Sequence, residues 1–251
     1  MKNGKRSAVT FYIVMIIIAV LPACGPPSIA EPPTARDLGQ LAIGEDVFGT
    51  FYAYVPTSIP ENPDILVLVH GTPSKDGTAE ADAEFYASNW IDFAEEQGFI
   101  LIVPAFAQED FSSRLGDHAM GGYRGLFGRK IGADEWVLRL VNAYQQEFGS
   151  ANEPFFLYGH SAGGQFAGRF LVTHPESVKK AVITSATTYP QPNTEVTWSF
   201  GMGELHTDIE WDVDTIQQLD SPNNPCPGQN CFNLLHNDRF CLLCYNASEI
   251  S

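Results

Sequence analysis

The fold of this chain is decided by Phe155-Phe156-Leu157-Tyr158-Gly159-His160-Ser161-Ala162-Gly163-Gly164, a short apolar run that leads into Gly-x-Ser-x-Gly. A sharp turn from strand to helix exposes the serine hydroxyl, and its closely packed backbones require glycine or very small residues beside the serine. Gly159, Gly163 and Gly164 meet that requirement. A glycine-rich turn that contains a serine by chance is the alternative, and the context argues against it. We therefore predict that Ser161 is a nucleophile.

The chain around this turn contains several apolar runs that have the length of strands. Continuous aliphatic sequence is typical of strands that are buried on both faces of a parallel sheet. Such a run occupies 65–69, and further strands are predicted at 99–103, 155–158 and 178–185. A partly alternating run at 47–55 predicts an earlier antiparallel strand.

Stretches with helical periodicity separate these runs. An amphipathic stripe from Trp136 to Phe148 predicts a helix that ends at Gly149, and a helix after Ser161 ends before Pro175. An earlier helix, which ends at Gly98, is predicted by apolar residues at helical spacing: Phe85, Tyr86, Trp90, Phe93 and Ala94. Repeated strand–helix units predict an α/β fold with a mostly parallel sheet and helices on both faces.

Two motifs in this order resemble the α/β-hydrolases, over roughly residues 45–190. The strand at 65–69 runs into His70-Gly71-Thr72-Pro73, which is similar to the His-Gly oxyanion turn of that family. Gly159-His160-Ser161-Ala162-Gly163 resembles its nucleophile elbow. The run at 51–56, Phe-Tyr-Ala-Tyr-Val-Pro, also looks like the opening of esterases of the polyhydroxyalkanoate-depolymerase and feruloyl-esterase type.

The resemblance implies roles for the residues of both motifs. Acyl transfer places negative charge on the former carbonyl oxygen, and each backbone N–H aimed at that oxygen lowers the barrier by about 3 kcal/mol. The resemblance implies that Ala162 N–H is one donor and that the backbone near Thr72 is the other. Gly71 lets the main chain approach the substrate. We expect His70 to be a buried residue that shapes the loop rather than the catalytic base.

The acid and the base of a catalytic triad are not identified by the sequence. In α/β-hydrolases they follow the serine in the order acid, then histidine, each after a further strand. No aliphatic run of that kind follows residue 185, and we expect the chain to lack its last strands through truncation, a frameshift or an incomplete gene model. Of the remaining histidines, we expect His160 to be structural and His118 to lie in a surface loop. Candidates by residue type, each equally consistent with a solvated side chain, are Asp208, Asp212, Asp214, Asp220, Asp238, His206 and His236.

The amino terminus predicts export. Residues 1–6 carry three basic side chains, and the apolar run at 8–21 is shorter than the about 18 residues that a membrane-spanning helix needs. Leu21-Pro22-Ala23-Cys24 resembles the lipobox of bacterial lipoproteins. That resemblance implies cleavage after Ala23, a lipid on Cys24 and a lipid-anchored position on a membrane of the bacterial cell envelope. An uncleaved amino-terminal anchor is the alternative.

Charge and cysteine content limit the partners. The net charge of −16 argues against binding to nucleic acid, and loss of a leader with three basic and no acidic residues makes the chain more acidic still. Four cysteines besides Cys24 suggest disulfides, or a zinc site, and a third reading is that 232–251 is not native sequence. Pairing of neighbours is the expected disulfide pattern for Cys226, Cys231, Cys241 and Cys244. No motif for a cofactor or a catalytic metal is present.

We therefore predict a serine hydrolase that cleaves carboxylic esters, small or polymeric, through an acyl-enzyme on Ser161. A hydrolase-fold lipoprotein without a complete triad, acting as a binding module or fragment, is one alternative, and a serine peptidase of the same fold is another. The predicted divisions are a signal peptide at 1–23, a tether at 24–44, an α/β-hydrolase core at 45–190, and an irregular cap or tail at 191–251.

Overall fold

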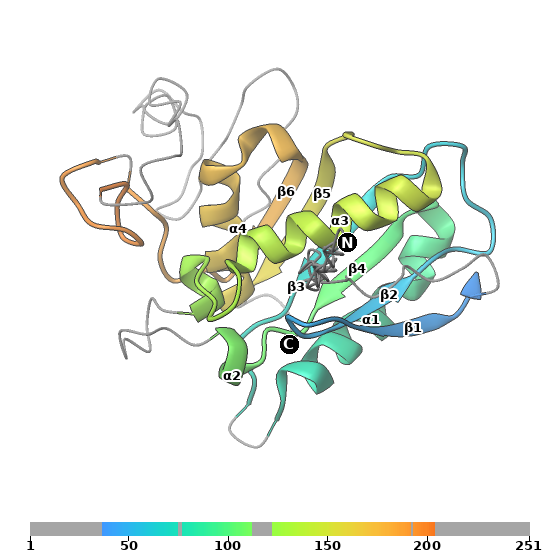
Figure 1. Cartoon of the computed structure of the whole chain (residues 1–251), viewed down its shortest axis with the longest axis horizontal. Helices are drawn as coiled ribbons and strands as arrows, with labels where there is room; N and C mark the ends of the chain where they lie inside the picture. Colours follow the sequence, from blue (N-terminus) through green and yellow to red (C-terminus); the bar gives the residue numbers. More distant parts are fainter. Residues whose placement is uncertain (1–36, 75–76, 112–121, 192, 204–251) are drawn as a thin grey trace, which may run out of the picture.

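A computed structural model describes residues 37–74, 77–111, 122–191 and 193–203. The described residues form one sheet of six strands in the order β1-β2-β4-β3-β5-β6 (Figure 1). The first two strands are antiparallel to their neighbours, and the other four run parallel to one another. The predicted α/β fold with a mostly parallel sheet is confirmed. The strands are β1 (Leu41–Glu45), β2 (Thr50–Tyr54), β3 (Ile65–Val69), β4 (Ile100–Pro104), β5 (Phe155–His160) and β6 (Val178–Thr184).

Helices cover both faces of the sheet, as predicted. Successive side chains of a strand point to opposite faces, and the core is divided accordingly. Val67, Ile102 and Leu157 belong to the cluster that also includes buried residues of α3 (Ala133–Phe148) and α4 (Ala162–Thr173). The strand residues next to these in the sequence, such as Leu66 and Leu101, point to the other face and pack with α1 (Ala79–Gln97). Figure 1 shows α1 on the side of the sheet opposite to α3.

Helix α1 ends where the sequence predicted, but a different set of its side chains is buried. Gly98 follows its last turn in the left-handed conformation, at φ 72°, which glycine adopts at little cost. Ala94 of the predicted stripe is buried, and Tyr86 and Trp90 are partly buried against the same core cluster. The other buried side chains are alanines, which let the helix approach the sheet closely: Ala79, Ala83 and Ala87. Of the predicted stripe, Phe85 is 65% exposed and Phe93 is 42% exposed. Trp90 instead packs beside the sheet, with its ring 4.9 Å from that of Tyr158.

Several elements lie outside the sequence-based predictions. Strand β1 was not predicted, and it begins at Leu41, before position 45, where the sequence places the start of the core. The region after Phe106 contains α2 (Gln108–Phe111) and the 3-10 helix η2 (Gly122–Gly125), and η3 (Pro175–Ser177) precedes β6. Residues 193–203 form turns with a bridge between Thr197 and Gly203.

Some predictions fall on residues outside the described ranges and stay predictions. They are the leader and its lipid at Cys24, the loop with His118, and everything predicted for 204–251, including its acids, histidines, cysteines and missing strands. Within the described ranges, no helix has the length and apolar character needed to cross a membrane.

Candidate active site

Ser161 occupies the junction between β5 and α4. Its backbone has φ 54° and ψ −112°, a region that costs a residue with a side chain of the order of 1–3 kcal/mol. The neighbouring structure holds it there: Ser161 N–H donates to the carbonyl of Thr184 on β6 at 2.8 Å, and its own carbonyl accepts from Gln165 N–H at 3.0 Å. Ser161 is therefore a strained residue at the first turn of a helix, not a residue inside one.

The glycines of this turn are required by close backbone contacts. A Cβ atom on Gly159 would lie 2.1 Å from the carbonyl oxygen of Gly163. A Cβ atom on Gly163 would lie 2.1 Å from the carbonyl oxygen of Val69 at the end of β3. Any side chain at either position would displace main chain, so the strand-to-helix turn can form only with glycine there.

The His-Gly turn lies against the serine. Strands β3 and β5 are parallel neighbours, with Val69 opposite Gly159, so their carboxyl ends meet at the same edge of the sheet. A Cβ atom on Gly71 would lie 3.4 Å from Cβ of Ser161. Thr72 is exposed, and Ala162 is buried as the first residue of α4. The structure thus brings together the two motifs that the sequence separates by about ninety residues.

His70 is buried, and both of its ring nitrogens have partners. The Phe106 N–H donates to Nε2 at 3.1 Å, so Nε2 is the acceptor and Nδ1 carries the proton. Nδ1–H then donates to the carbonyl of Gly71 at 2.7 Å. Burial lowers the pKa of His70 from its ordinary value of 6.5 and favours this neutral form. The ring links β4 to the His-Gly turn, and neither nitrogen is directed to Ser161.

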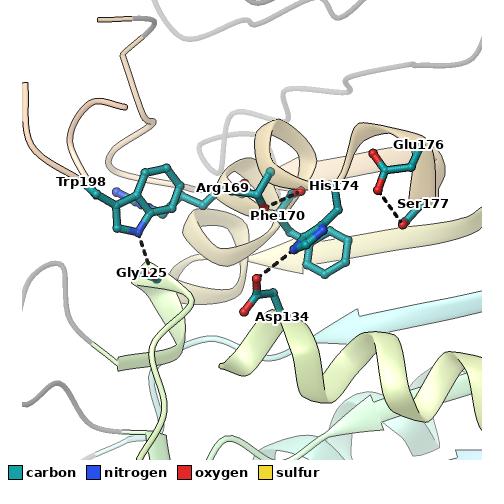
Figure 2. A network of polar contacts seen from close by, with 9 residues as sticks. Gly125, Asp134, Arg169, Phe170, His174, Glu176, Ser177 and Trp198 are labelled. Carbon is teal, nitrogen blue, oxygen red and sulfur yellow. Dashed lines mark hydrogen bonds and ion pairs between the residues drawn. The ribbon is translucent and has the colours of Figure 1, made fainter. Parts of the chain in front are cut away.

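The other two histidines in the described residues also have partners. His160 Nδ1 lies 3.0 Å from Oγ1 of Thr184 on β6. His174, just after the last residue of α4, places Nε2 2.8 Å from Oδ2 of Asp134, at the start of α3 (Figure 2). A base and an acid for Ser161 are therefore not identified within the described ranges, and no group of three or more potential metal ligands occurs there.

Sequence reasoning missed two residues that contact the His-Gly turn. Tyr123 and Arg124, neighbours on η2, hold this turn from the side of the long segment after β4. The Tyr123 hydroxyl donates to the carbonyl of Gly71 at 2.9 Å, and Arg124 Nη2 donates to Oγ1 of Thr72. Their only distinguishing feature in the sequence is the glycines on either side, which do not indicate a partner 52 residues away.

The segment 193–203 is fixed to the helix of the nucleophile and to η2. Arg169, which is fully buried on α4, donates from Nε and Nη2 to the carbonyl of Ser199 at 2.9 and 2.7 Å. Trp198 Nε1 donates to the carbonyl of Gly125 on η2 at 2.8 Å (Figure 2). Burial lowers the pKa of Arg169 to about 10, so its guanidinium remains charged at neutral pH.

No protein-family model matches the chain. Among curated proteins, it is 27% identical to acetylxylan esterase A of Talaromyces purpureogenus over 154 residues, which is 61% of this chain and 38% of that protein. It is 25% identical to the probable acetylxylan esterase A of Aspergillus fumigatus over 182 residues, 72% of this chain and 46% of that protein. The chain thus spans less than half the length of these relatives.

Solved structures show the same fold. Poly(aspartic acid) hydrolase-1 of Sphingomonas sp. KT-1 matches with a TM-score of 0.50 and 26% identity, over 63% of this chain and 59% of that one. The poly(3-hydroxybutyrate) depolymerase of Bordetella parapertussis matches with a TM-score of 0.52 and 20% identity, over 67% and 60% of the two chains. The fold of the described residues is that of the α/β-hydrolases, and the chain's relatives are esterases and hydrolases.

Proposed function

We propose that this protein is a serine hydrolase that cleaves carboxylic esters through an acyl-enzyme on Ser161. One observation carries the proposal: a serine held at φ 54° between a central strand and a helix lies against a glycine turn at the end of the adjacent strand. Residues held in strained backbone conformations cluster at active sites, and here the strained serine also lies next to the turn at Gly71. The esterase names of the sequence relatives support the same conclusion.

The proposed chemistry follows from this arrangement. The Ser161 hydroxyl attacks the acyl carbon, and the former carbonyl oxygen becomes an oxyanion. Ala162 N–H opens α4, where the first turn has N–H groups without partners inside the helix and a dipole that favours negative charge. Thr72 N–H is the second proposed donor, and Gly71 leaves space for the acyl group between the two. A general base takes the Ser161 proton during the attack and passes it to the departing oxygen, so the alcohol leaves. Water then attacks the acyl-enzyme, which releases the acid and restores the Ser161 hydroxyl.

For the substrate, we propose a short acyl ester, either on a small molecule or on a polymer. The named substrates of the relatives, acetylated xylan and poly(3-hydroxybutyrate), are polymeric esters. The likeness to a poly(aspartic acid) hydrolase favours testing the serine peptidase alternative as well, because that polymer is joined by amide bonds. A panel of nitrophenyl acetate, butyrate and longer esters beside chromogenic peptides separates the two, and faster turnover of the peptides would favour the peptidase.

Covalent labelling tests the nucleophile. A fluorophosphonate probe should label the full chain at Ser161, and Ser161→Ala should abolish both labelling and ester turnover, a loss of about 10⁴-fold or more. Ser177→Ala, on the short helix η3, is the matched control and should label like the wild type. If folded wild-type protein is not labelled, Ser161 is not activated, and the reading as a catalytically incomplete binding module replaces the proposal.

A further inference from the structure

The carbonyl of Gly71 accepts two side-chain hydrogen bonds, one from the preceding residue, His70, and one from Tyr123 on η2. His70 Nδ1 lies at 2.7 Å and the Tyr123 hydroxyl at 2.9 Å. Tyr123 has little freedom to move, because it is 7% exposed and its ring is stacked on Phe106 with 4.8 Å between centroids. The direction of this carbonyl is therefore set by buried groups and not by the local turn alone.

A fixed carbonyl also fixes the next N–H. The peptide bond between Gly71 and Thr72 is trans, so the Gly71 carbonyl and the Thr72 N–H point in opposite directions within one rigid plane. We propose that Tyr123 and Arg124 are positioning residues that direct the Thr72 N–H at the oxyanion formed on Ser161. This inference rests on the proposed function and names part of the machinery that the function needs.

Arg124 acts on the other end of the same peptide unit. Its Nη2 donates to Oγ1 of Thr72. Tyr123 therefore holds the Gly71 carbonyl on one side of the proposed N–H donor, and Arg124 holds the Thr72 side chain on the other. A guanidinium binds through a planar array of donors. Its positive charge beside Thr72 also favours the negative charge that develops in the transition state.

The helix η2 is itself tied to the helix that carries the nucleophile. Trp198 donates to the carbonyl of Gly125 on η2 (Figure 2), and the next residue, Ser199, accepts from the buried Arg169 of α4. The proposed oxyanion donor and Ser161 are thus connected through residues 198–199 as well as through the sheet. This connection explains why an arginine is buried eight residues after the serine.

The test compares two buried tyrosines that each lose one hydroxyl. Tyr123→Phe keeps the stacked ring and removes the hydrogen bond to Gly71. Tyr144→Phe on α3 is the matched control, because the Tyr144 hydroxyl is buried and has no hydrogen-bond partner in the described part of the chain. The measurements are the rate constant for labelling of Ser161 by the fluorophosphonate, kcat and KM for nitrophenyl acetate, and inhibition by a trifluoromethyl ketone, which forms an oxyanion on the serine.

We expect Tyr123→Phe to lower the labelling rate and kcat by about tenfold, less than the 10²- to 10³-fold loss on removing an oxyanion donor outright, and to weaken the trifluoromethyl ketone by a similar factor. KM should change by less than about twofold, because ground-state binding does not use the oxyanion donors. Tyr144→Phe should match the wild type in all of these. If Tyr123→Phe fails to fold, the same losses are expected for Arg124→Met, with partial recovery in Arg124→Lys.

The outcomes separate this inference from the proposed function. If the wild type is labelled at Ser161 and Tyr123→Phe reacts like Tyr144→Phe, the positioning role is overturned and the hydrolase proposal stands. A variant that loses thermal stability and labelling rate, while the ratio of its inhibition constant for the ketone to its KM stays unchanged, also overturns the positioning role. A merely structural role predicts that result. Absence of labelling in the wild type overturns the proposed function and this inference together.

Discussion

At the scale of single residues, the site is built from buried polar groups whose hydrogen bonds are used to hold the main chain. His70 is fully buried, yet its ring accepts from one backbone N–H and donates to one backbone carbonyl. An unpaired buried polar group would cost about 1–3 kcal/mol, so both bonds matter to the fold. The His70 side chain of the His-Gly motif therefore holds the turn through its hydrogen bonds, and approach of the substrate at Gly71 belongs to the proposed function.

This burial gives His70 a predictable effect on stability. Its pKa in the folded protein lies below the ordinary value of 6.5, so below that pH the unfolded chain binds more protons and stability falls. The slope contributed by one such group is up to about 1.4 kcal/mol per pH unit. We expect His70→Gln to flatten the dependence of the unfolding free energy on pH between about 6.5 and 5, measured by urea denaturation. An unchanged slope would show that His70 titrates normally.

At the scale of elements, the turn between β5 and α4 depends on helix α4 approaching the end of β3. Gly163 lies in the first turn of α4, where its missing side chain admits the carbonyls of Val69 and His70. Glycine is ordinarily the weaker helix former by about 1 kcal/mol relative to alanine, so its presence here reflects packing and not helix propensity. The same helix carries Gly168, where a Cβ atom would meet its nearest neighbour, Tyr189, at 3.4 Å.

Two alanine substitutions on α4 should therefore have opposite effects. Gly163→Ala places a Cβ atom 2.1 Å from a backbone oxygen, and we expect a loss of about 3 kcal/mol in unfolding free energy together with loss of labelling at Ser161. Gly168→Ala should leave stability unchanged or raise it by up to about 1 kcal/mol, with labelling retained. Chemical denaturation of both variants measures this, and equal stabilities would contradict the close approach of α4 to β3.

At the scale of the whole molecule, the segment 193–203 connects η2, which contacts the turn at Gly71, with α4, which follows Ser161. Residues 193–203 lie beyond the last described strand, yet Trp198 contacts η2 (Figure 2) and Ser199 contacts α4. A buried charged arginine is expensive unless its donors are satisfied. Arg169 meets this condition by binding the carbonyl of Ser199 twice and that of Gln165 once.

Arg169→Met should detach this segment while filling most of the buried space. Removing the guanidinium leaves the Ser199 carbonyl without its donors, and we expect a loss of about 3 kcal/mol in stability. Hydrogen exchange should rise at 193–203 and on η2 more than in the strands. Lys180→Met, at an exposed residue of β6, is the control and should change stability by less than about 0.5 kcal/mol. Uniform exchange changes across the sheet would contradict a local anchor.

Much of the fold and the core of the site could be predicted from the sequence. Glycine spacing around Ser161 predicted the turn, because steric exclusion of a Cβ atom acts between neighbouring residues. Apolar runs predicted four of the strands to within two residues at either end, and Gly98 and Gly149 marked the ends of two helices. The pattern of α1 was misleading for Phe85 and Phe93, which are exposed. Helical spacing shows that residues share one face of a helix, but not whether that face is directed at the sheet.

The sequence by itself determined the strand-to-helix turn at Ser161 and the turn at Gly71, because both follow from the conformations that short, contiguous stretches can adopt. Only the tertiary structure decided that these turns meet, that Tyr123 and Arg124 hold the turn at Gly71, and that Arg169 binds the segment 193–203. A hydrogen bond between residues 52 positions apart depends on how the intervening loop packs. That packing reflects the energy of the entire chain and leaves no periodic mark in the sequence near either residue.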